Sequence, residues 1–154
     1  ARYDCSIVGN NLVAQMDTIA VDEMGMSPSY NQNTNDSASY VDIYSSLNNY
    51  LGLTDSNNQY KPRWPGTSST IALNWINDSL RAGFPPVLFF NGKLPGYQSS
   101  IAHYVTIIGC DYETGMVAFS DPHYSNGYFG IHFCHIDDIN VLVSNWVVFH
   151  NSNN

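Results

Sequence analysis

The sequence contains few charged residues and very few positive ones. Charged residues make up 12 % of the 154 residues, and 5 Lys and Arg stand against 13 Asp and Glu, for a formal net charge of -8. So few basic residues exclude a nucleic-acid-binding surface, which needs a basic patch to neutralise phosphates. They also exclude electrostatic attraction to anionic lipid surfaces. No run of about 18 apolar residues is present, so no segment is predicted to span a membrane.

The remaining composition is that of a globular protein. Hydrophobic residues make up 44 % of the chain and aromatic residues 14 %, enough for one buried core at this length. We therefore treat residues 1–154 as a single domain, which we expect to be a monomer. The chain begins at Ala1 without an initiator Met, which fits a mature secreted protein, although a shortened chain would begin in the same way.

The first half of the sequence has helical periodicity. Apolar residues recur at three- to five-residue spacing over 6–24, and again between Asp36 or Ser37 and Leu51, which predicts two amphipathic helices. A third helix is predicted from Ser68 or Ser69 to Leu80. Residues 53–67 between the second and third helices contain several Pro and Gly residues, so this segment is predicted to be a loop.

The second half of the sequence has strand-like patterns separated by turn residues. Gly115 is placed for the left-handed position of a hairpin turn, and Asp137 for the start of a short helical turn. Five strands are predicted, over residues 86–90, 102–110, 116–120, 128–134 and 146–149. The predicted fold class is therefore α+β, with a helical N-terminal half packed on an antiparallel β-sheet from the C-terminal half.

The chain has three cysteines, and one of them differs in its surroundings. Cys110 and Cys134 lie in apolar strand-like runs, where they could form a disulfide or remain buried thiols. Cys5 precedes the first predicted helix. The positive end of a helix favours the thiolate, which is the nucleophilic form of cysteine. Cys5 is therefore the candidate nucleophile.

A nucleophilic cysteine needs a histidine to take its proton and a third group to orient that histidine. His103 opens the longest predicted strand, and Asp121 ends the strand that returns from it. If the turn pairs Asp111 with Met116, position 106 faces position 121. His103 and Asp121 would then lie at the same end of the sheet, close enough for the carboxylate to reach the imidazole.

These segments resemble a known family. The runs 102–112 and 115–122 look like the His and Asp strands of papain-like cysteine peptidases, with the closest likeness to the bacterial C39-like branch. The resemblance covers roughly residues 70–125, and the Asp4-Cys5 start more loosely. It implies a papain-like fold and cleavage of peptide or peptide-like amide bonds through an acyl-enzyme, without a cofactor. It also implies that Cys5 is the nucleophile, His103 the general base and Asp121 the orienting residue.

Two features differ from the family pattern. Cys5 is followed by Ser6-Ile7-Val8, where the family has Gly or Ala and then Pro or a small residue. No Gln precedes Cys5, so the second donor to the oxyanion is unassigned. Two alternatives follow: a non-catalytic secreted binding module on the same fold, and acyl transfer to amines in the manner of transglutaminases.

The substrate would be a peptide or a protein. Trp64 and Tyr97 lie on the two long predicted loops, where they could line a cleft that binds substrate. His123 follows the Asp121-Pro122 corner and is a second imidazole near the proposed site. We interpret His123 as a loop residue.

A metal site is weakly indicated at one place. His132, Cys134 and His135 are close in sequence, but a strand directs residue 135 to the face opposite 132 and 134, and no CxxC or HExxH motif accompanies them. We therefore predict no metal ion.

Overall fold

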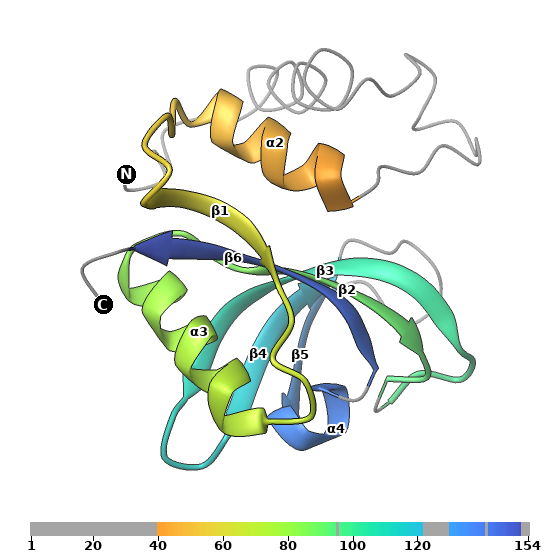
Figure 1. Cartoon of the computed structure of the whole chain (residues 1–154). Helices are drawn as coiled ribbons and strands as arrows, with labels where there is room; N and C mark the ends of the chain where they lie inside the picture. Colours follow the sequence, from red (N-terminus) through yellow and green to blue (C-terminus); the bar gives the residue numbers. More distant parts are fainter. Residues whose placement is uncertain (1–39, 95, 122–129, 141, 152–154) are drawn as a thin grey trace, which may run out of the picture.

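A computed structural model describes residues 40–94, 96–121, 130–140 and 142–151. The described strands form one antiparallel sheet, and helices lie against it (Figure 1). In chain order the elements are α2 (Tyr40–Tyr50), β1 (Asn58–Arg63), α3 (Ser69–Arg81), β2 (Val87–Gly92), β3 (Ile101–Asp111), β4 (Met116–Asp121), β5 (Gly130–His135), α4 (Ile136–Asn140) and β6 (Val143–Asn151). None of these helices is long and apolar enough to cross a bilayer.

The six strands are arranged in the order β1-β6-β2-β3-β4-β5, and all neighbouring pairs are antiparallel. Strands β3 and β4 form the predicted hairpin, in which Asp111 pairs with Met116. Gly115 in the turn has φ 73°, a left-handed conformation that glycine adopts at little cost. The last strand in sequence, β6, pairs between β1 and β2, which makes β1 an edge strand.

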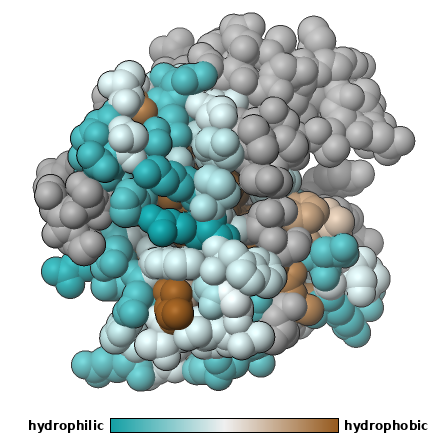
Figure 2. Space-filling view, in the orientation of Figure 1, coloured by the Kyte–Doolittle hydropathy of each residue, from teal (hydrophilic) through white to brown (hydrophobic). Residues whose placement is uncertain are grey.

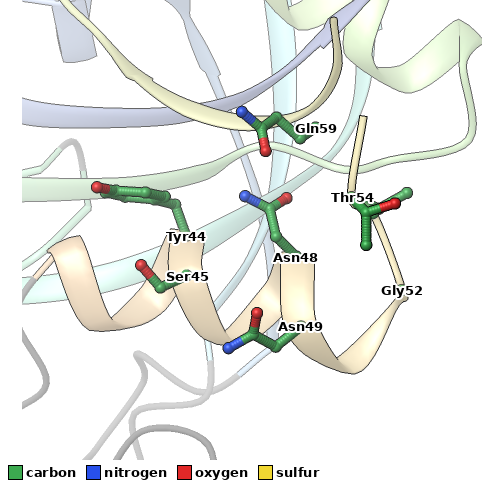
Figure 3. A pocket seen from close by; sticks show the side chains of 8 residues that line it. Tyr44, Ser45, Asn48, Asn49, Gly52, Thr54 and Gln59 are labelled. Atoms are coloured by element: carbon green, nitrogen blue, oxygen red, sulfur yellow. The ribbon is translucent and has the colours of Figure 1, made fainter. Parts of the chain in front are cut away.

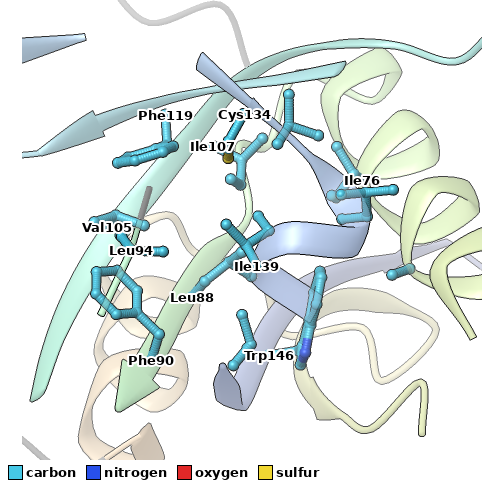
Figure 4. Packing of buried hydrophobic residues seen from close by; sticks show 14 of the residues in the cluster. Ile76, Leu88, Phe90, Leu94, Val105, Ile107, Phe119, Cys134, Ile139 and Trp146 are labelled. Carbon is cyan, nitrogen blue, oxygen red and sulfur yellow. The ribbon is translucent and has the colours of Figure 1, made fainter. Parts of the chain in front are cut away.

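The larger hydrophobic core lies on the face of the sheet that α3 and α4 cover (Figures 1 and 4). Alternate residues of each strand point to this face, so the strands contribute Leu88, Val105 and Val117 to the same cluster. Trp146 is its largest fully buried side chain. Helix α3 adds Ala72, Leu73 and Ile76 to this core, and α4 adds Ile136 and Ile139.

A smaller core lies between α2 and the opposite face of the sheet. Ile43 on α2 packs with Tyr60, Val147 and Phe149 of strands β1 and β6. Asn48 on the same helix binds the edge of β1: its amide nitrogen donates to the Tyr60 carbonyl at 2.9 Å, and its amide oxygen accepts from the Tyr60 N–H at 2.7 Å. The side chain therefore takes the place of a neighbouring strand at this residue.

The described surface is mostly polar on the side shown in Figure 2. The coloured residues in this view are largely hydrophilic or intermediate in hydropathy, with small, separate hydrophobic areas. This agrees with a sequence in which only 12 % of the residues are charged and uncharged polar residues are more numerous.

The predicted fold class is wrong for the described residues. Strands account for 42 % of the described residues and helices for 27 %. The structure is therefore mainly a six-stranded antiparallel sheet with few helices. The N-terminal half contributes β1 in the segment predicted as a loop, 53–67. This strand has only one buried side chain, Tyr60, and contains Pro62, so it lacks the alternating pattern of a half-buried strand. Pro is tolerated there because β1 is an edge strand.

Other local predictions are confirmed. Helix α3 begins after Ser68, whose hydroxyl accepts a hydrogen bond from the Ile71 N–H as an N-cap should. Each of the five predicted strands is present with slightly different ends, and α4 provides the short helical segment at Asp137. The predicted helix over 6–24 lies outside the described residues.

Asn48 gives a test of the contact between α2 and the sheet. We expect Asn48→Ala to lower the free energy of unfolding by about 2–3 kcal/mol, because it removes two buried hydrogen bonds to the Tyr60 backbone. The matched control is Asn49→Ala on the exposed side of the same helical turn, with an expected change within about 0.5 kcal/mol. Urea denaturation of the full chain measures both. Equal effects would show that the contact does not stabilise the fold.

Candidate functional site

His103 and Asp121 are in direct contact. His103 is the third residue of β3 and Asp121 is the last residue of β4. Nε2 of His103 lies 2.6 Å from Oδ1 of Asp121. The Asp121 side chain is completely buried, whereas 16 % of the His103 side chain is exposed. The contact predicted from the sequence is therefore present, with a buried carboxylate behind an imidazole that reaches the surface.

A β-bulge places the two side chains on the same face of the sheet. Thr106 pairs with Ser120, while Gly109 pairs with Ala118, so the register shifts by one residue around Ile108. The predicted pairing of position 106 with position 121 is therefore wrong by one residue. In the unshifted register Asp121 would share a face with Thr106 and point away from His103. Because the bulge adds one residue to β3, Asp121 instead shares a face of the sheet with His103.

The second carboxylate oxygen of Asp121 has its own donor. Tyr97 is 3 % exposed, and its hydroxyl donates a hydrogen bond to Oδ2 of Asp121. Tyr97 therefore lies on a loop, as expected, but its hydroxyl contacts the buried carboxylate. Two donors from two different segments, one on each oxygen, hold the carboxylate of Asp121.

Aromatic side chains surround this group of hydrogen bonds. Phe90 on β2 pairs with His103 across the strands, and the two rings meet edge to face with centroids 6.0 Å apart. His132 on β5 stacks on Phe119 at 5.2 Å and lies 5.7 Å from the Tyr97 ring. Aromatic rings therefore pack against both His103 and Tyr97 beside the buried Asp121 carboxylate, and hydrogen bonds are stronger in such a low-dielectric interior than in water.

The arrangement sets the tautomer of His103. A carboxylate only accepts hydrogen bonds, so Nε2 carries the proton in the contact with Asp121. In the neutral ring, Nδ1 is then the nitrogen without a proton. A buried carboxylate that contacts an imidazole also occurs in catalytic triads, where it orients the general base.

The remaining candidate residues of the predicted site are Cys5, His123 and Trp64. Cys5 and His123 lie outside the described residues. Trp64 follows β1 and is 66 % exposed, and two strands, β6 and β2, separate β1 from β3 in the sheet. Trp64 therefore remains a prediction for a surface that binds substrate.

Cys110 and Cys134 are both free thiols. Cys110 pairs with Val117 on one side of β4, and Cys134 pairs with Val117 on the other side. Two residues separated by an intervening strand are about 9–10 Å apart, beyond the Cα separation that a disulfide spans. Of the two possibilities left open by the sequence, the structure contains unpaired thiols.

Burial suppresses the reactivity of both thiols. Desolvation, followed by the nearby Asp138 carboxylate, raises the pKa of Cys134 to about 12. Desolvation and then Asp111 also raise the pKa of Cys110. A thiol attacks carbonyl carbon as the thiolate, so neither residue is suited to act as a nucleophile at neutral pH.

The residues of the weak zinc pattern do not converge. The half-buried His132 packs on Phe119, while Nδ1 of His135 contacts Asp137 at 3.2 Å. Within the described segments, no group of three or more His, Cys, Asp or Glu side chains is arranged to hold a metal ion.

A separate pocket lies between the C-terminal end of α2 and β1 (Figure 3). Its volume is about 510 Å³. The lining contains Tyr44, Asn48 and Gln59, and no lining residue carries a charge. Helix α2 lies on the face of the sheet opposite α3, whereas the His103–Asp121 contact belongs to the α3 face. The pocket is therefore not continuous with that contact.

Sequence reasoning did not find the contact between Tyr97 and Asp121. Tyr97 was singled out only as an aromatic residue on a loop. Its position follows from the turn in which its N–H donates to the Leu94 carbonyl at 3.0 Å, and from Gly96 with φ 86° within that turn. Pro95-Gly96 was a visible turn signal, but which strand end the turn approaches depends on the packing of the sheet.

The structure predicts slow modification of the two thiols in the sheet. At pH 8 we expect iodoacetamide to label Cys134 at least about 100-fold more slowly in the native protein than in guanidinium-unfolded protein, because burial keeps the thiol protonated. Mass spectrometry of the labelled peptides measures both rates. The unfolded sample is the control for intrinsic reactivity, and rapid native labelling of Cys134 would contradict the burial of this side chain.

Comparisons with known proteins add no further information about the site. No family model, no curated protein and no solved structure matches the chain. The most specific feature of the site is the hydrogen bond between His103 and Asp121.

Proposed function

We propose that the protein is a thiol hydrolase that cleaves peptide or peptide-like amide bonds. Cys5 would be the nucleophile, His103 the general base and Asp121 the residue that orients His103. The observation that carries the proposal is the 2.6 Å contact between Nε2 of His103 and the buried Oδ1 of Asp121. A hydrogen bond to a carboxylate fixes the ring orientation and makes the other ring nitrogen a better base.

The reaction follows from these roles. His103 takes the thiol proton of Cys5, and the thiolate attacks the carbonyl carbon of the amide. The carbon–nitrogen bond then breaks, the leaving amine receives the proton from His103, and a thioester remains. Water attacks the thioester with His103 as the base, the carbon–sulfur bond breaks, and the sulfur takes back the proton. One water is consumed, and an amine and a carboxylic acid are released.

Cys5 is the remaining thiol once the other two cysteines are considered. The sequence contains three cysteines, and burial raises the pKa of both Cys110 and Cys134. Cys5 directly precedes a predicted helix, whose N-terminus favours an anion. The order Cys, His, Asp also agrees with the sequence resemblance to papain-like cysteine peptidases.

The surroundings of the reaction belong to the same proposal. A net charge of -8 favours the approach of basic or neutral peptides over acidic ones. The polar, weakly charged composition agrees with a secreted protein, and we propose that the chain acts outside the cell as a monomer without a cofactor.

Alkylation tests whether Cys5 is an activated thiol. We expect iodoacetamide to label Cys5 rapidly well below pH 8, because a neighbouring imidazole stabilises the thiolate. In His103→Ala the rate should follow the pH dependence of an ordinary thiol. His135→Ala is the matched control, since His135 lies at the far end of β5 from the Asp121–Gly130 pair. Slow, ordinary labelling of Cys5 in the wild-type protein would exclude the proposed nucleophile and favour a non-catalytic binding module.

Peptide cleavage tests the function itself. In an assay of amide hydrolysis with a mixed peptide library, we expect Cys5→Ala to abolish turnover. Asp121→Asn should lower kcat/KM by about 100-fold or more, because the amide no longer holds the required tautomer of His103. Product masses with and without an added primary amine separate hydrolysis from acyl transfer. Full activity of Asp121→Asn would contradict the proposed role of the carboxylate.

A further inference from the structure

The contact between Tyr97 and Asp121 points to a role beyond packing. Both residues are buried, Tyr97 at 3 % and Asp121 at 1 % exposure. The Tyr97 hydroxyl donates to Oδ2 of Asp121, while His103 contacts Oδ1. We propose that Tyr97 is a positioning residue, which fixes the carboxylate of Asp121 and through it the imidazole of His103. This inference rests on the proposed function for its catalytic meaning, but its structural content can be measured independently.

Tyr97 restricts the orientation of the carboxylate. The terminal torsion of an aspartate has a broad, two-fold energy profile, so every donor that binds one of its oxygens limits the rotation of the group. A hydrogen bond also offsets the cost of burying a carboxylate oxygen. The Tyr97 hydroxyl does both, because it binds Oδ2 while His103 contacts Oδ1.

Tyr97 is itself held by its neighbours. Its N–H donates to the Leu94 carbonyl, and Leu94 is buried. The edge of Phe90 meets the Tyr97 ring with centroids 6.4 Å apart, and the same phenylalanine meets His103 at 6.0 Å. Phe90 therefore packs against both donors of Asp121, and the hydroxyl is presented from a ring that has little freedom to move.

The alternative is that Tyr97 only fills the core, and that its hydroxyl donates a hydrogen bond to Asp121 because this is the nearest acceptor. Tyr60 provides a matched control for this alternative. It is also buried, at 1 % exposure, and its hydroxyl donates to a protein acceptor, the Pro85 carbonyl at 3.0 Å. Tyr60 belongs to the smaller core, on the opposite face of the sheet. Tyr97→Phe and Tyr60→Phe thus remove the same chemical group from the two cores.

The experiment uses NMR to observe the imidazole N–H of His103 in the full chain labelled with ¹⁵N-histidine. The resonance of this N–H is assigned as the one that changes in the Asp121→Asn variant. We expect Tyr97→Phe to move this proton signal upfield, because a carboxylate that is less firmly held forms a weaker hydrogen bond with the imidazole. We also expect exchange of this proton with water to become roughly three- to tenfold faster, which corresponds to the free energy of one ordinary hydrogen bond. Tyr60→Phe should leave both quantities at their wild-type values, even where it lowers the temperature of unfolding.

A second variant keeps the test decisive if Tyr97→Phe does not fold. Gly96 has φ 86°, and a Cβ there would meet no atom within 4 Å, so Gly96→Ala strains the turn before Tyr97 without a clash. It should change the His103 signal in the same direction by a smaller amount. An unchanged signal in the folded variants would overturn the positioning role.

Activity assays separate this inference from the proposed function. If peptides are cleaved, Tyr97→Phe should lower kcat several-fold and leave KM near its wild-type value, while Tyr60→Phe changes neither. If no peptide is cleaved but the His103 signal responds to Tyr97→Phe, the proposed hydrolase is wrong and the positioning of the pair stands. If cleavage occurs and the signal does not respond, the positioning role is wrong and the hydrolase proposal stands.

Discussion

The site depends on a one-residue change of register between β3 and β4. Side chains alternate between the two faces of a strand, so a shift of one residue exchanges the faces that the side chains occupy. The bulge around Ile108 makes this exchange. As a result, Ile107 and Cys110 both face the large core, and His103 and Asp121 can meet. Without the bulge, Asp121 would point to the opposite face from His103.

Burial of the Asp121 carboxylate is the second constraint. A charged group in a low-dielectric interior is tolerated only when its oxygens are paired. Tyr97 and His103 supply that pairing from a loop and from a neighbouring strand. Burial acts differently on Cys134, because desolvation and then the nearby Asp138 carboxylate raise its pKa to about 12. The interior therefore keeps one anion ordered and one thiol protonated.

The fold and the site were predictable to different degrees. The helix after Ser68 and the hairpin at Gly115 depend on local signals, which operate over a few residues and were read correctly. Strand β1 was missed because its residues carry no alternating pattern and its pairing with β6 joins segments far apart in the sequence. The contact between His103 and Asp121 was expected from strand ends, but the register assumed for it was wrong by one residue.

The sequence by itself determined the residue types available for chemistry, the turn that joins β3 to β4, and the low number of basic residues. These follow from composition and from interactions between neighbours along the chain. Only the tertiary structure decided that Asp121 and His103 share a face, that Tyr97 reaches the second carboxylate oxygen, and that β4 separates Cys110 from Cys134. Each of these depends on strand register and on packing between distant segments, where a shift of one residue reverses the outcome.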